Sequence, residues 1–327
     1  MNRAMIEQAI RHAASTGALR CDAAESAHFA RELEHVYGRT FDVEYPELKS
    51  RILVPASPDP AGEADKVFTY RMFDYVASTQ PGADYADDPP RSDAFGKEYQ
   101  HAIRPVTGSY GYSIDELMAS AKYGRPLDAS RARGTRLAIE QEIDRVIALG
   151  DDRFSDPDIK GFCNHDGVDA ALVADDGTGP SREWKDKTPD LIKRDILEPI
   201  KKLRTDSKGV ENGPWTIVLP TSAYTEIVTR RLTDALGETV ASWLLREVPW
   251  IAGFEEWGRL DSVGSGSTGR MLIYERNADK VHYQVPMEFT QLPPEARVFE
   301  VTVACHARTG GIALPRPKSM AYRDGIC

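Results

Sequence analysis

The residues that could do chemistry are few, and the best-known motif among them lies in the wrong context. Gly264-Ser-Gly-Ser-Thr-Gly269 matches the G-x-G-x-x-G pattern of dinucleotide-binding loops. That pattern works only between a preceding strand and a following helix, whose N-terminus holds the pyrophosphate. Here a strand-like run, Met271–Tyr274, follows the glycines instead. We therefore interpret the segment as a flexible loop and expect no cofactor.

Cysteine and histidine give a second candidate, a metal site. Cys163 and His165 lie close in sequence, as do Cys305 and His306. Zinc sites use such ligands, but the two pairs are far apart and no C-x-x-C pair occurs. Cys305 also falls on the apolar face of an alternating strand pattern, where a cysteine acts as a small hydrophobic residue. We expect neither a metal site nor a disulfide framework.

A third candidate is a Ser-His-Asp set, Ser92, Asp93 and His101, on an extended stretch of chain. A triad depends on geometry and on a pocket that excludes water, and an extended arm supplies neither. No G-x-S-x-G elbow, P-loop or H-E-x-x-H sequence occurs. The sequence thus predicts no catalytic residues, although an active site on the 187–285 lobe described below stays open as an alternative.

Composition indicates a large globular protein with an acidic surface. The 327 residues, 41% of them hydrophobic, are too many for one ordinary core, so we expect two or more lobes. No apolar run approaches the ~20 residues of a membrane span. The net charge of −10 argues against dedicated nucleic-acid binding. Residues 1–10 read as an amphipathic helix without a signal-peptide core, which favours a protein made in the cytosol.

The most informative pattern is a long two-stranded arm. A strand-like run begins at Lys66, a polar excursion follows over 78–93, and a second extended run returns through Gly96 to Arg104. An isolated two-stranded sheet is marginal in water, so the arm needs a surface to lie on. We expect that surface on a neighbouring subunit.

The arm carries the candidate interface residues. Tyrosine is enriched in the cores of protein interfaces, and acidic side chains near the tip would suit basic groups on a neighbour. The candidates are Tyr70, Tyr75, Tyr85, Asp87, Asp88 and Tyr99. Two alternatives stay open: the tyrosines could cover the arm's own strands, and the aspartates could be solvated turn residues.

A long helix is predicted over 128–149, with Asp128 as its N-cap. An apolar stripe of Ile139, Ile143, Val146 and Ile147 should pack on strands near Val301 and Val303. Arg136 and Glu140 form a favourable i,i+4 pair.

Residues 187–285 have the texture of a compact α/β lobe. A helix from Thr188 contains Pro199, which should kink or shorten it, and a buried-type strand follows over 215–219. Strand texture returns at 299–305 and 311–314, and these strands should rejoin the lobe of the long helix. Residues 1–65 hold two helical patterns and a Pro-rich linker, read as an arm or equally as a small cap.

The order of elements resembles the major capsid proteins of tailed bacteriophages, of the Hong Kong 97 type, in their prophage branch. Four strings carry the resemblance, which covers roughly Phe41 to Gly325: Asp84-Tyr-Ala-Asp-Asp-Pro-Pro90, Gly111-Tyr-Ser-Ile-Asp-Glu-Leu117, Ile139-Glu-Gln-Glu-Ile-Asp-Arg145 and 150–164. In that family the arm is the E-loop and the long helix is the spine helix.

The resemblance implies an α+β fold in five parts. These are an N-terminal arm (1–65), the E-loop hairpin (66–112), a peripheral domain with the spine helix (113–186), an inserted α/β axial domain (187–285) and peripheral return strands (286–327). A glycine-rich loop in an axial domain could approach a symmetry axis, so Gly264 and Gly266 join the interface candidates. A lysine on the arm forms a crosslink in the founding member; Lys97 lies on this arm, but the crosslink is not carried over.

The implied function is a structural shell subunit that assembles as hexamers and pentamers into an icosahedral phage head. The implied partners are further copies of the chain, a portal, scaffolding or decoration proteins and, by non-specific contact, packaged DNA; no membrane partner is expected. The implied location is the virion, after synthesis in the cytoplasm of a bacterial host. The alternatives are an encapsulin-like compartment shell and a soluble α/β enzyme using the 187–285 lobe.

Overall fold

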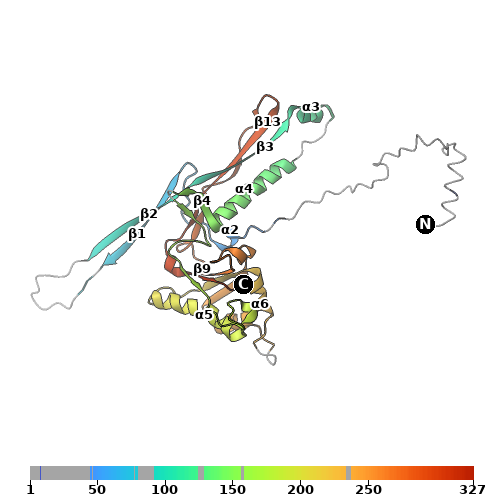
Figure 1. Cartoon of the computed structure of the whole chain (residues 1–327). Helices are drawn as coiled ribbons and strands as arrows, with labels where there is room; N and C mark the ends of the chain where they lie inside the picture. Colours follow the sequence, from blue (N-terminus) through green and yellow to red (C-terminus); the bar gives the residue numbers. More distant parts are fainter. Residues whose placement is uncertain are drawn as a thin grey trace, which may run out of the picture. The chain divides into compact units, whose positions relative to one another are not determined.

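The computed structural model describes Gln8, Tyr45 and residues 47–76, 78–79, 92–123, 129–155, 158–232 and 237–327. The chain divides into two compact units, 1–47 and 48–327. The helical patterns expected near the N-terminus lie outside the described residues, so the architecture below is that of the second unit (Figure 1).

A five-stranded mixed sheet forms the centre of one lobe. Its strand order is β6-β15-β9-β7-β8, with β6 parallel to β15, β7 parallel to β8, and β9 antiparallel to both of its neighbours. The strands are β6 (Asp169–Leu172), β7 (Trp215–Leu219), β8 (Ile251–Glu256), β9 (Arg270–Glu275) and β15 (Met320–Asp324). Residues 320–324 thus join this sheet, whereas the sequence had placed all of 286–327 with the long helix.

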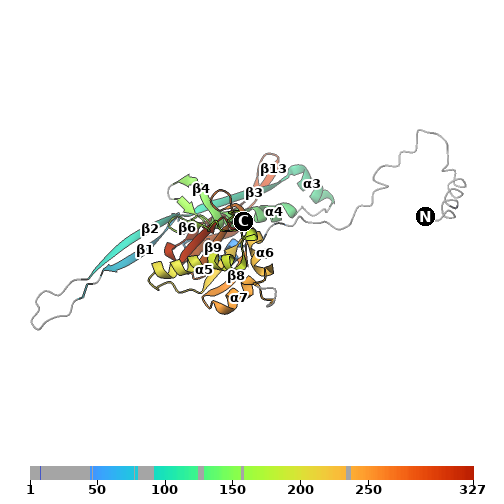
Figure 2. The ribbon, with the colours of Figure 1, turned by 60° about the horizontal axis from the view of Figure 1, so that its bottom comes forward.

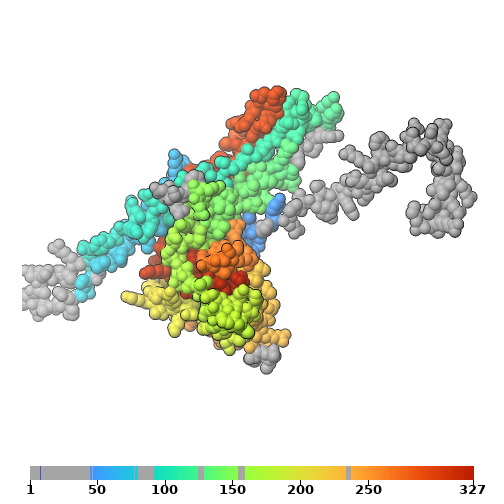
Figure 3. Space-filling model, viewed as in Figure 1, coloured from blue at the N-terminus to red at the C-terminus, as the bar shows by residue number. Residues whose placement is uncertain are grey.

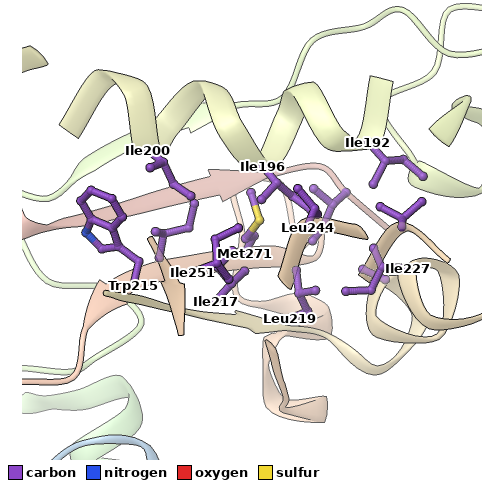
Figure 4. Packing of buried hydrophobic residues seen from close by; sticks show 14 of the residues in the cluster. Ile192, Ile196, Ile200, Trp215, Ile217, Leu219, Ile227, Leu244, Ile251 and Met271 are labelled. Atoms are coloured by element: carbon purple, nitrogen blue, oxygen red, sulfur yellow. The ribbon is translucent and has the colours of Figure 1, made fainter. Parts of the chain in front are cut away.

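Three helices cover one face of that sheet. They are α5 (Pro189–Asp206), α6 (Thr221–Thr229) and α7 (Val240–Glu247). Ile192, Ile196 and Ile200 recur on one face of α5 and belong to one cluster with Trp215 and Ile217 of β7. Figure 4 shows Ile200 near Trp215 and Ile192 at the other end of the cluster, on the side of Ile227. The helix runs through Pro199 without ending there. The sequence suggested that Pro199 would either kink or shorten this helix. The proline does not shorten it.

The other face of the sheet is also buried, because alternate residues of its strands point the opposite way. Leu272, Tyr274 and Tyr322 pack here against Leu53 of the short helix α2 (Ser50–Leu53) and against Phe162. Tyr274 donates a hydrogen bond to the carbonyl of Leu53 at 2.6 Å. The segment around α2 is therefore part of the body, and the predicted arm of 1–65 is too long at its C-terminal end.

A second sheet carries the long helix. Strand β13 (Glu300–Thr309) pairs along its whole length with β3 (Arg104–Ser113). On its other edge β13 pairs with β11 (Met287–Gln291) and β12 (Glu295–Ala296). Helix α4 (Ser130–Leu149) lies across it, and Ile139, Ile143 and Ile147 pack on Val303 and Cys305.

Helix α4 agrees with its prediction in the stripe and differs in two details. The Arg136–Glu140 ion pair forms at 2.8 Å. The N-cap is Ala129, without a side-chain hydrogen bond, and the predicted cap Asp128 lies outside the described residues. Val146 packs beside Ala102 and Ile159 instead of on β13.

The hairpin consists of β1 (Val67–Val76) and β2 (Asp93–Ala102), paired antiparallel over ten residues each. No other strand among the described residues pairs with either of them. The hairpin is shorter in sequence than the predicted 66–112, because β3 leaves it after Ile103 to pair with β13.

Short elements connect these parts. Helix α3 follows β3, two small pairs of strands form beside α4 and near the C-terminal end of β13, and three 3-10 turns complete the chain. They are α3 (Ile114–Tyr123), β4 (Gly150–Ser155) with β5 (Asp158–Lys160), β10 (His282–Gln284) with β14 (Gly311–Ala313), η2 (Trp184–Asp186), η3 (Gly258–Ser262) and η4 (Pro317–Ser319).

Candidate assembly surfaces

The base of the hairpin is held by an aromatic ladder on one of its faces. Directly paired residues of an antiparallel ladder share a face, and here Tyr70 lies opposite Tyr99 and Phe68 opposite His101. The ring centroids are 5.2 Å and 5.0 Å apart, with the rings stacked. Burial, with Tyr99 beside it, raises the pKa of Tyr70 to about 12. These tyrosines thus cover the hairpin's own strands, one of the two alternatives left open.

His101 is the titratable group at this base. Its imidazole stacks on Phe68 and lies 5.6 Å from the Tyr70 ring, measured between centroids. Burial, and to a smaller extent the nearby His165 and His282, lowers its pKa to about 4. The ring is therefore neutral at pH 7 and acts there as an aromatic packing residue.

The outer half of the hairpin is different, because its apolar side chains are exposed. Phe73 is 60% exposed, Tyr75 75% and Phe95 62%. The register places Phe73 and Tyr75 on one face and Phe95, opposite Asp74, on the other. Figure 3 shows this segment in blue and cyan, with no other described segment lying over it in that view. Apolar residues on both faces of a two-stranded ribbon have no core to enter.

A second exposed apolar site lies just before the start of β13, beside the end of β3. Val298 is 81% exposed and Phe299 79%. Arg131 of α4 supports it: its guanidinium donates to the carbonyl of Gly111 at 2.7 Å, binds both carboxylate oxygens of Glu116 and lies over the ring of Tyr112. The sequence does not point to this site, because Phe299 falls at the start of an alternating strand pattern.

The glycine-rich loop lies between η3 and β9, as predicted. The amide of Gly264 donates to the carbonyl of Thr268, and Gly266 has a positive φ of 72°. Asp324 accepts a hydrogen bond from the amide of Ser265 and pairs with Arg270. The loop is thus closed on itself and anchored to β15. Its proximity to a symmetry axis stays a prediction.

The candidate chemistry finds no support in the described residues. His101 and Ser92 lie at opposite ends of β2, so they stand about 30 Å apart at ~3.3 Å per residue. Burial raises the pKa values of the Cys163 and Cys305 thiols, which opposes formation of the reactive thiolate. No group of three metal-ligating side chains comes together within the ranges described. No described helix is long and apolar enough to cross a membrane.

Of the eight candidate interface residues, three lie outside the described residues: Tyr85, Asp87 and Asp88. Tyr70 and Tyr99 lie at the hairpin base, and Tyr75 lies in its exposed outer half. Gly264 and Gly266 lie in the loop before β9. The structure therefore separates the candidates into two regions, the hairpin and the loop.

A family model described as "Major capsid protein" matches residues 79–326, about three quarters of the chain. The chain belongs to this family. It is therefore a structural protein, a subunit of a capsid shell. No curated protein matches the chain.

Solved structures of capsids share the fold. The capsid of Myoviridae phage XM1 matches with a TM-score of 0.75 at 17% identity, covering 90% of this chain and 98% of that one. The capsid of the native GTA particle matches with a TM-score of 0.60 at 11% identity, over 94% and 100% of the two chains. A virus-like particle from Pyrococcus furiosus gives 0.50 at 12% identity, over 84% and 91%. These likenesses confirm the predicted Hong Kong 97-type fold.

Proposed function

We propose that this capsid subunit assembles through its hairpin, with β1 and β2 lying across a second copy. The observation that carries the proposal is the exposure of Phe73, Tyr75 and Phe95 on two faces of a ribbon that no other described strand pairs with. Burying apolar surface contributes about 25 cal/mol per Å². One exposed ring gives a modest gain, but the gain repeats at every copy of a closed shell.

The finer architecture belongs to the same proposal. The subunits would form hexamers and pentamers of an icosahedral head, with a portal, scaffolding or decoration proteins and enclosed DNA as partners, made in the cytoplasm of a bacterial host. The lobe around β7 and β9 would be the axial domain, and the sheet carrying α4 the peripheral domain. The support is membership of the capsid family and the two separate cores.

The test is the double variant Y75S/F95S in the full chain. Both side chains are exposed, so the circular dichroism spectrum and Tm should match those of the unchanged protein. The yield of particles in negative-stain microscopy should fall about tenfold or more, because each closed shell repeats the weakened contact many times. Q100S, an exposed polar position on the same hairpin, is the matched control and should assemble normally. Unchanged particle yield in Y75S/F95S would contradict the proposal.

A further inference from the structure

A groove on the lobe of the five-stranded sheet is the strongest unassigned feature of the molecule. It has a volume of about 1300 Å³ and runs along α5 beside Trp243 of α7 and Trp250 just before β8; Figure 2 shows these elements in one lobe. Leu197 and Ile200 line its floor, and both belong to or pack on the core. Trp250 is 40% exposed. The groove is therefore lined by apolar side chains that pack in the core and by the indole rings of Trp243 and Trp250.

Cations stand at the edges of this groove. The ammonium of Lys193 lies 4.5 Å from the centre of the Trp243 ring, and the guanidinium of Arg204 lies 4.3 Å from that of Trp250. Lys201 is exposed on the same helix and also lines the groove. Such cation–π contacts hold a flexible charged side chain in place.

The balance of charge along the groove is positive, although the chain carries a net charge of −10. Its lining includes four cations and two carboxylates, namely Lys193, Arg194, Lys201, Arg204, Asp190 and Glu198. Arg194 is already paired with Asp176 and Asp195. Lys193 is paired with Asp190 at 2.6 Å. Lys201 and Arg204 therefore remain opposite one carboxylate, that of Glu198. An acidic ligand with apolar or aromatic groups fits this chemistry.

The chain itself contains such a ligand. Residues 80–91 read Gln-Pro-Gly-Ala-Asp-Tyr-Ala-Asp-Asp-Pro-Pro-Arg, with three aspartates against one arginine. Tyrosine and proline rings pack well on indoles, and proline lowers the entropy lost when a peptide is bound. The segment is joined to the outer half of the hairpin, whose exposed rings are proposed above to contact another subunit.

We propose that the groove along α5 binds residues 80–91 of a second copy of this chain. The inference rests on the proposed function, because it names the contact that the hairpin would make at its far end. The apolar floor disfavours a nucleic-acid backbone, which prefers basic and polar surfaces.

The first experiment measures binding in solution. The receptor is the full chain with residues 80–91 replaced by a short Gly-Ser linker, so that no copy can fill the groove. The probe is a fluorescent peptide of residues 78–93, followed by anisotropy at 0.15 M salt. We expect saturable binding, weakened about tenfold or more by K201E/R204E. A peptide with Asp84, Asp87 and Asp88 changed to Asn should lose affinity similarly.

The control for charge reversal is K122E/R133E, two exposed cations on α3 and α4, outside the groove; Lys122 also lies over a ring, that of Tyr123. This variant should bind the peptide as the unchanged receptor does. Equal weakening by both double variants would overturn the proposal, because the attraction would then be non-specific. A 12-nucleotide single-stranded DNA that binds in place of the peptide, and is lost in K201E/R204E, would also overturn it.

A second experiment uses the complete chain and needs no replaced segment. K201D/R204D and D87K/D88K should each lower the yield of particles, and the four changes together should restore it. Failure of this rescue, with peptide binding also unaffected by K201E/R204E, would overturn the groove assignment. The peptide assay needs no shell, so groove-dependent binding by a chain that never forms particles would instead contradict the proposed function.

Discussion

At the scale of single residues, buried charged and polar side chains tie distant segments together. Asp144 of α4 is almost fully buried, accepts from the amide of Ser50 at 2.9 Å and pairs with Arg259 of η3. Ser50 in turn donates from its hydroxyl to the carbonyl of Asp144. The two sheets are thus joined near α2 by contacts whose partners lie far apart in the sequence.

Ile143→Asp should destabilise the subunit before any assembly step. The side chain is fully buried against β13, and an unpaired carboxylate there costs roughly 4 kcal/mol or takes up a proton. That is a large part of a domain's usual margin of about 5–15 kcal/mol. Urea unfolding of the soluble fraction and a protease-sensitivity assay measure the loss. Ile143→Val, with a cost of about 1 kcal/mol, is the control; a stable Asp variant that merely fails to assemble would move this stripe to a subunit interface.

His101 makes the base of the hairpin sensitive to acid. Its folded pKa of about 4 lies below the ordinary histidine value of 6.5, so the unfolded chain binds more protons between these values. Stability is then fully present above pH 6.5 and decreases as the pH falls toward 4. Hydrogen exchange of β1 and β2 amides should accelerate over this window. His101→Phe, which keeps the ring stack, should flatten the profile; an unchanged profile in that variant would remove His101 as the cause.

At the scale of elements, the two halves of the hairpin differ in their contacts. The base packs within its own subunit, and the outer half is proposed to contact another subunit. Its base is held by stacked rings and by Ala102, which packs on Val146 and Ile159. Its outer half has an ion pair, Arg71–Glu98 at 2.7 Å, and exposes the rings of Phe73, Tyr75 and Phe95. An exposed pair of this kind contributes at most about 1 kcal/mol, so we expect the proposed contact with a second copy to stabilise the outer half.

Deleting residues 78–93 should therefore leave a folded subunit that assembles poorly. The deleted stretch is polar and rich in proline and glycine, and none of its described residues, 78–79 and 92–93, belongs to the four cores. Circular dichroism and Tm should change little, while light scattering should show loss of large particles. Global unfolding of the deletion variant would show that this stretch contributes to a core.

The elements also show what the sequence could and could not predict. The stripe of α4 was predictable, because a period of 3.6 residues depends only on local sequence. The position of β15 was not: Arg323 and Asp324 look like surface residues until their partners Asp169 and Arg270 are known. The groove along α5 was missed for the same reason, since Trp243 and Trp250 reach it from other elements. Long-range pairing carries no local signature in a single sequence.

At the scale of the whole molecule, two of the hydrophobic cores of the second unit lie under different helices. The lobe around β7 buries an all-apolar cluster under α5, and the sheet of β3 and β13 buries a smaller one under α4. The two surfaces proposed to contact other copies lie on different parts of the subunit: the groove is on the lobe around β7, and the hairpin adjoins the sheet of β3 and β13. Assembly therefore requires that both parts be folded and rigid.

The most direct test of the central claim is the particle size of the purified full chain. Analytical ultracentrifugation at micromolar concentration, over a range of salt and pH, should reveal rings or shells much larger than the 36.3 kDa subunit. Negative-stain microscopy of the same samples should show closed particles or capsomers. A clean monomer under every condition tested would contradict assembly through the hairpin.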